Sequence, residues 1–238
     1  MLRCSVRVFD TPHLAAAAAG EAFIDGVSEF NRRLAGVAAG RTMKPVYDHL
    51  VSAEARSSGL FSRTTFVQLD EVVSAGRGDA SFSEEIDRHL LSRLSGGYRT
   101  FLVINGQTNQ PDVEANRHRA TILENGGLGV QLLGIGVNGH VGFNEPGCEP
   151  DSRCRVTELA MSTLKRNGYP PDTRAVTLGI AEIRSAQRII IVATGAAKSP
   201  AVKAMIEGQK SRSCPASLLR GHPDLALFMD RAAAKDLS

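Results

Sequence analysis

Five clusters of polar and glycine residues each follow a short apolar segment that is typical of a β-strand. The clusters are residues 39–42, 70–71, 105–106, 134–140 and 194–195. They include an acid, Asp70, a histidine, His140, and two glycine-rich loops, so they could combine proton transfer with anion binding. Ligands of open α/β sheets bind beyond the carboxyl ends of the strands. We therefore expect these clusters to meet at one rim of a sheet.

The segment 134–139 matches the pattern G-x-G-x-x-G after a predicted strand. A dinucleotide site would require the third glycine to open a helix. The chain instead continues as HVGFNEP over residues 140–146, and the glycine and proline in this run are helix-breaking types. The sequence therefore predicts a loop here and no nucleotide cofactor.

Strand-like and helix-like patterns alternate along the chain. The expected strands are 5–9, 34–39, 64–69, 101–104, 129–133, 188–193 and 225–229, and the expected helices are 12–33, one opening at residue 44, one after Ser81, 112–125, 180–186 and 197–207. This order predicts an α/β fold: one domain over 1–238, with a doubly wound, Rossmann-like, mostly parallel sheet and helices on both faces. Residues 147–175 lack a clear period, which predicts an irregular segment or lid.

Composition excludes several classes of protein. The 238 residues are 42% hydrophobic, unlike a disordered chain, and the net charge of +3 is a weak footprint for nucleic-acid binding. No run of about 18 apolar residues is present, which predicts no membrane span and a cytoplasmic protein. The four cysteines form no CxxC pair and the six histidines are scattered, so no metal is expected.

Residues 133–146, LGIGVNGHVGFNEP, resemble the signature of the glucosamine-6-phosphate deaminase (isomerase) family. The likeness extends over nearly the whole chain, including FVQLDE at 66–71, ATGAAK at 193–198 and CPASLL at 214–219. Galactosamine-6-phosphate deaminases and 6-phosphogluconolactonases share the family fold. The lactonases usually lack the FNEP run, which favours a deaminase.

The resemblance implies that a hexosamine 6-phosphate opens to its aldehyde, isomerises through an enolamine and releases ammonia, giving a ketose 6-phosphate. It implies that Asp70 is the base at C2, that His140 is the acid/base for ring opening, and that Glu145 orients the imidazole. Many members of the family carry Asp where this chain has Asn138. Asn can form hydrogen bonds but cannot hold negative charge, so we expect His140 to rely more on Glu145 here.

The resemblance also implies a site for the substrate phosphate. The residues it marks for substrate or phosphate binding are Gly40, Arg41, Thr42, Gly136, Gly139 and Lys198. A family arginine falls at the position of Tyr169, which offers no charge. Because a guanidinium can bind phosphate through two hydrogen bonds, we predict that Arg41 supplies the missing cation.

Several alternatives stay open. Glucosamine 6-phosphate is favoured narrowly over galactosamine 6-phosphate, because residues 164–170 also resemble the galactosamine branch. Three further alternatives are a lactonase, a simple aldose–ketose isomerase and a non-catalytic sugar-phosphate sensor. A sensor should lack Asp70, His140 and Glu145. It should also carry a helix-turn-helix, for which no room is expected before the first strand. The chain ends soon after Asp230, so the regulation of the longer family members is not expected, and a homo-oligomer is left open.

Overall fold

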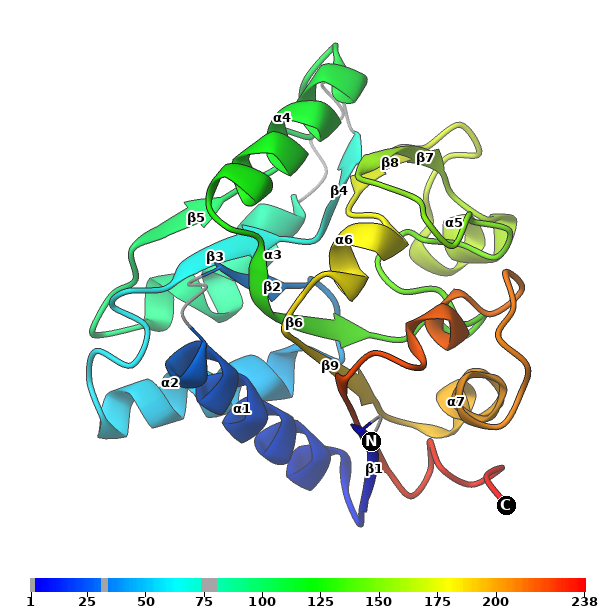
Figure 1. Cartoon of the computed structure of the whole chain (residues 1–238), viewed down its shortest axis with the longest axis horizontal. Helices are drawn as coiled ribbons and strands as arrows, with labels where there is room; N and C mark the ends of the chain where they lie inside the picture. Colours follow the sequence, from blue (N-terminus) through cyan, green and yellow to red (C-terminus); the bar gives the residue numbers. More distant parts are fainter. Residues whose placement is uncertain (1–2, 31–33, 74–80) are drawn as a thin grey trace.

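A seven-stranded sheet forms the centre of the structure, a computed structural model that describes residues 3–30, 34–73 and 81–238 (Figure 1). The strand order is β1-β10-β9-β6-β2-β3-β5, and every neighbouring pair is parallel. The strands are β1 Arg3–Phe9, β2 Leu34–Val37, β3 Thr65–Gln68, β5 Thr100–Leu102, β6 Leu128–Gly134, β9 Arg188–Ala193 and β10 Asp224–Asp230. Such a sheet confirms the predicted α/β class.

Helices cover both faces of this sheet. The helices of the described residues are α1 Pro12–Glu29, α2 Lys44–Arg56, α3 Phe82–His89, α4 Pro111–Glu124, α5 Met161–Asn167, α6 Ile180–Arg184 and α7 Ser199–Ile206. In Figure 1, α1 and α2 lie together below the sheet, while α6 lies above it. The inner strands are apolar on both faces because both are covered; in β9 every residue from Ile189 to Ala193 is buried.

Local signals set the helix ends. Thr11 caps α1 by accepting a hydrogen bond from the N–H of Leu14, and Pro12 takes the first helical position, as predicted. The helix ends at Glu29, and the extended Phe30 is its C-cap, so the prediction is too long at this end; residues 31–33 fall outside the described residues. The predicted helix 197–207 begins instead as a 3₁₀ turn, Ala196–Lys198, before α7.

The segment 147–175 differs from the expectation. It contains β7 Arg155–Glu158, the helix α5 and the start of β8 Arg174–Thr177. With β4 Asp70–Val73, these strands form an antiparallel sheet in the order β4-β8-β7. The prediction of irregular structure was wrong because strands of four residues, one of them half exposed, are too short to give a clear period. The lid stays a prediction.

Within the three described ranges, no helix is both long enough and apolar enough to span a membrane.

Candidate functional site

The loop after β6 folds tightly around His140. The N–H of Gly136 donates to the carbonyl of His140 at 2.8 Å, and the N–H of Gly139 donates to the carbonyl of Gly136 at 3.0 Å. A Cβ at residue 136 would lie 2.5 Å from atoms of the imidazole, so the backbone there leaves no room for a side chain. The carbonyl of Gly139 in turn accepts a hydrogen bond from Ala216, at 2.8 Å. Gly136 and Gly139 therefore position the histidine through the backbone.

His140 is paired with Glu145. Nδ1 of His140 lies 3.2 Å from Oε2 of Glu145, within ion-pair range although its geometry falls short of a hydrogen bond. Glu145 is buried, and burial alone would raise its pKa; the His140 ring, the Thr163 hydroxyl and the Asn138 amide more than offset this, so that the pKa is lowered. The carboxylate is thus held in its charged form beside the imidazole.

Asn138 binds both partners of this pair. Its Nδ2 donates to Oε2 of Glu145 at 2.9 Å and to Oγ of Ser162 at 3.2 Å. Its Oδ1 accepts the backbone N–H of His140 at 3.2 Å. An ionised Asp could make the last contact but could not donate to Glu145. The Asn at this position therefore adds a donor to Glu145 in place of a second negative charge.

Asp70 starts β4, two residues after β3 ends, and its side chain is buried. Asp70 pairs with Thr177 of β8, whose hydroxyl accepts the N–H of Phe143 at 3.1 Å. At the neighbouring Gly142, φ is +57° and a Cβ would lie 3.3 Å from Oδ2 of Asp70. The loop that carries His140 is therefore fixed against the strand that carries Asp70.

The Asp70 carboxyl has an unusual affinity for its proton. Burial, and then the neighbouring charge of Glu71, raise its pKa to about 8. A carboxylate with a pKa near the working pH is a suitable general base. This electrostatic property agrees with the role that the sequence predicts.

The loop between β2 and α2 holds Gly40, Arg41 and Thr42. Gly40 has a φ of +120°, and its N–H donates to Oε1 of Glu85 at 3.3 Å. The N–H of Gly40 therefore already has an acceptor within the protein. Arg41 is exposed and Thr42 is half-buried. The use of this loop as a phosphate cradle stays a prediction.

Lys198 contacts the loop after β6 from the side of β9. Its Nζ donates to the carbonyl of Ile135 at 2.5 Å. Burial and the positive charges of Arg166 and Arg41 lower its pKa to about 8. Three cations therefore act on one another near the same loop.

Arg166 was missed by sequence reasoning, which considered only Tyr169 as the replacement for the family arginine. Arg166 lies on α5, three residues before Tyr169, which follows the end of this helix at Asn167. That spacing was the available signal.

Among the described residues, no group of three or more His, Cys, Asp or Glu side chains is placed to hold a metal ion.

Comparison with known proteins supports a family assignment. The family model described as glucosamine-6-phosphate isomerases/6-phosphogluconolactonase matches residues 12–227. A glucosamine-6-phosphate deaminase of Bacillus velezensis is 38% identical over 207 residues, covering 84% of this chain and 86% of that protein. A solved structure described as a monomeric glucosamine-6-phosphate deaminase has a TM-score of 0.88 at 29% identity, covering 97% of this chain and 99% of the other.

A more distant structure shows how far the fold extends. The 6-phosphogluconolactonase of Trypanosoma brucei has a TM-score of 0.77 at 20% identity, with full coverage of both chains. At this identity the likeness concerns the fold alone. The match of the family model over nine-tenths of the chain and the close bacterial relatives agree, and the chain belongs to the glucosamine-6-phosphate isomerase/6-phosphogluconolactonase family.

Proposed function

We propose that this protein is an amino-sugar phosphate deaminase that converts glucosamine 6-phosphate and water to fructose 6-phosphate and ammonia. The observation that carries the proposal is the fixed approach of the His140 loop to Asp70 through Gly142. One small sugar could then contact both the base, Asp70, and the imidazole of His140, which is paired with a carboxylate. The Bacillus velezensis relative at 38% identity and the solved structure at 29% identity are both described as glucosamine-6-phosphate deaminases.

Ring opening is assigned to His140. The imidazole takes the proton of the C1 hydroxyl and returns a proton to the ring oxygen as the C1–O5 bond breaks, which leaves the open aldehyde. Histidine suits this exchange because it both gains and loses protons near neutral pH. Glu145 orients the ring through Nδ1, and Asn138 holds Glu145 through its amide. Asn138 and Glu145 therefore act through the histidine.

Isomerisation is assigned to Asp70. Its carboxylate takes the proton from C2, the C1 oxygen gains a proton, and the enolamine forms between C1 and C2. Return of the proton to C1 leaves an iminium ion at C2. Water then adds to C2 and ammonia leaves, so the product is a ketose. The buried position of Asp70 keeps it basic enough for the first step.

Phosphate binding is assigned to the cations around the loops, Arg41, Lys198 and the newly recognised Arg166. Their mutual repulsion, seen in the lowered pKa of Lys198, would be relieved by a dianion between them. Gly40, Thr42, Gly136 and Gly139 then shape the backbone on either side. A cytoplasmic location and a homo-oligomer stay predictions.

The test is a product balance. Purified protein is incubated with glucosamine 6-phosphate, and ammonia and fructose 6-phosphate are measured together. We expect equal amounts of both. Galactosamine 6-phosphate and 6-phosphogluconolactone are run in parallel. If only galactosamine 6-phosphate released ammonia, the assigned substrate would change to that epimer. If the lactone released acid and neither hexosamine phosphate released ammonia, the proposal would be overturned.

A further inference from the structure

Glu71 lies beside Asp70 on β4, yet its side chain points to the opposite face of the strand, because side chains alternate along β-structure. It is only 3% exposed. Five groups donate hydrogen bonds to its carboxylate: Nε2 of Gln68 at 2.8 Å, the N–H of Val72 at 3.0 Å, Oγ of Ser81 at 2.6 Å, and the N–H groups of Phe82 at 3.1 Å and Ser83 at 3.2 Å. Both oxygens of this buried carboxyl group therefore have hydrogen-bond donors around them.

Three of these donors belong to the start of α3. Ser81 is the N-cap, and the first backbone N–H groups of a helix have no partner within it. Glu71 satisfies two of them and places a negative charge where the helix dipole is positive. These N–H groups, of Phe82 and Ser83, thus find their acceptor on β4. Glu71 therefore ties the strand of Asp70 to α3.

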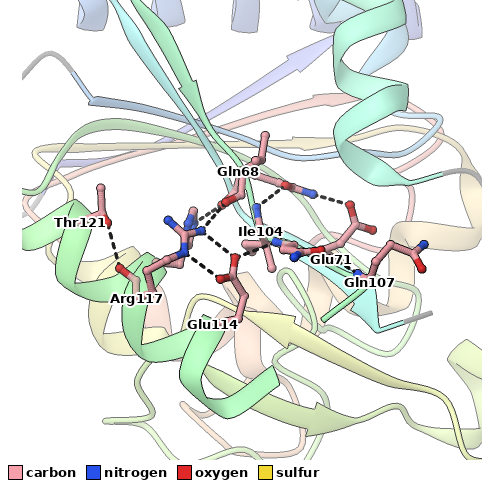
Figure 2. Close-up of polar contacts among 10 residues, drawn as sticks. Gln68, Glu71, Ile104, Gln107, Glu114, Arg117 and Thr121 are labelled. Carbon is pink, nitrogen blue, oxygen red and sulfur yellow. Dashed lines mark hydrogen bonds and ion pairs between the residues drawn. The ribbon is translucent and has the colours of Figure 1, made fainter. Parts of the chain in front are cut away.

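Gln68 links the Glu71 carboxylate to the backbone of Asp70. Its Nε2 donates both to Oε2 of Glu71 and, at 2.9 Å, to the carbonyl of Asp70. Its Oε1 accepts the N–H of Ile104 at 2.9 Å (Figure 2). Its carbonyl accepts a hydrogen bond from Nε2 of His118 at 2.9 Å. Gln68 is fully buried. The network thus joins β3, β4, α4 and the segment after β5 directly behind Asp70.

The space for Glu71 is prepared by Gly106. A Cβ at this position would lie 2.8 Å from Cγ of Glu71 and 2.5 Å from the carbonyl oxygen of Val72. Beside it, the N–H of Asn105 donates to Oε1 of Glu114 at 2.7 Å, which anchors the same segment to α4. The backbone of the 105–106 turn is therefore shaped around the Glu71 side chain.

We propose that Glu71 is a positioning residue for the deamination: it fixes the strand position of Asp70 and keeps a negative charge beside the carboxylate that takes the C2 proton. This inference rests on the proposed function. It adds a residue that never touches the sugar and acts only through Asp70.

The charges around Asp70 make the prediction specific. Glu71 is the charged neighbour that adds to burial in raising the pKa of Asp70. Tyr47 of α2 is close enough that Asp70 and Glu85, after burial, raise the pKa of its phenol, so Tyr47 stays neutral. Burial lowers the pKa of His118 to about 4, so this histidine behind Gln68 is neutral in any assay buffer. His140 and its partner Glu145 approach from the loop side.

The test replaces the charge and keeps the size. In Glu71→Gln we expect the acid limb of the kcat/KM profile to move to lower pH by about one unit, a typical size for an environmental shift. The direction follows because removing a like charge makes Asp70 easier to ionise. We expect kcat to fall about tenfold as Asp70 loses its support, with KM for the sugar phosphate nearly unchanged. Glu71→Asp, which keeps the charge, should leave the limb in place while kcat falls.

Glu114→Gln is the matched control, because it cuts the same network at α4, away from Asp70, and should not move the limb. The Asp70 carboxyl is also titrated directly by carbon NMR, with Asp70→Asn giving the assignment, and its midpoint should fall in Glu71→Gln. This titration needs no turnover, so it separates failure of the inference from failure of the proposed function. An unchanged midpoint and limb in Glu71→Gln would overturn the inference. If that variant does not fold, a wild-type kcat in Glu71→Asp would do so.

Discussion

The imidazole of His140 rests directly on the backbone of Gly136. A Cβ at residue 136 would come 2.5 Å from Cγ, Nδ1 and Cε1 of the ring, closer than side-chain atoms pack in proteins. The position of the ring is therefore set from one side by bare backbone and from the other by Glu145. The glycine-rich loop, which superficially resembles a nucleotide motif, serves to seat a histidine.

Gly136→Ala should displace the imidazole and lower kcat about a hundredfold, because a misplacement of about 1 Å in a reacting group costs roughly that much. The melting temperature should change far less than the activity. Gly134→Ala, two residues earlier at the end of β6, is the control, since a Cβ there meets only Cε of Met43 at 3.8 Å. Equal activity in both variants would show that the ring does not depend on this contact.

Asp70→Asn should lower ammonia release by about 10²- to 10⁴-fold, the usual contribution of a general base. It should also stabilise the protein. The folded-state pKa of Asp70 is raised to about 8, so its protonated form is favoured and the wild type loses stability as the pH rises from 4 through 8. Melting curves across this range should show a growing advantage for Asp70→Asn, and no advantage near pH 4. A lower melting temperature for Asp70→Asn than for the wild type at pH 8 would contradict a buried Asp70 carboxyl with a raised pKa.

Asn138→Asp should destabilise the protein in a pH-dependent way. It replaces a donor 2.9 Å from Glu145 with a second carboxylate, which raises the pKa of Glu145. We expect a loss of about 1–3 kcal/mol of unfolding free energy at pH 8, the range for a buried acceptor left without its donor. The loss should shrink at pH 5 as the pair takes up a proton. Asn138→Ala removes the same hydrogen bond without adding charge, so its loss should vary less with pH than the loss in Asn138→Asp.

Arg41→Ala and Arg166→Ala should each raise KM for the sugar phosphate about tenfold with little change in kcat, because they remove binding that is equal in the ground and transition states. Arg63→Ala, an exposed arginine after α2, is the control. In Arg41→Ala and in Arg166→Ala the pKa of Lys198 should rise, since each of these arginines helps to lower it. An unchanged KM in Arg41→Ala would remove Arg41 from the phosphate site.

Much of this arrangement is visible in the sequence, and the missing parts share a physical cause. β9 is a continuous apolar run from Ile189 to Ala193 and β6 is apolar apart from Gln131, so the sequence predicted both strands and the loops that follow them. The sheet of β4, β8 and β7 depends on pairing between residues 70–73 and 155–177, which no local pattern encodes. Glu71 likewise acts through donors ten to twelve residues away, on another element. Long-range hydrogen bonds of this kind leave no periodic trace.

In the proposed reaction, Asp70 takes the C2 proton from a sugar that the His140–Glu145 pair has opened. Glucosamine 6-phosphate carrying deuterium at C2 tests it most directly. We predict that the wild-type protein loses or transfers the deuterium as ammonia is released, with a slower rate than for the protonated sugar, and that Asp70→Asn leaves C2 labelled. Two results would contradict this role of Asp70. One is ammonia release by Asp70→Asn at the wild-type rate; the other is ammonia release by the wild-type protein with no isotope effect and no loss of label from C2.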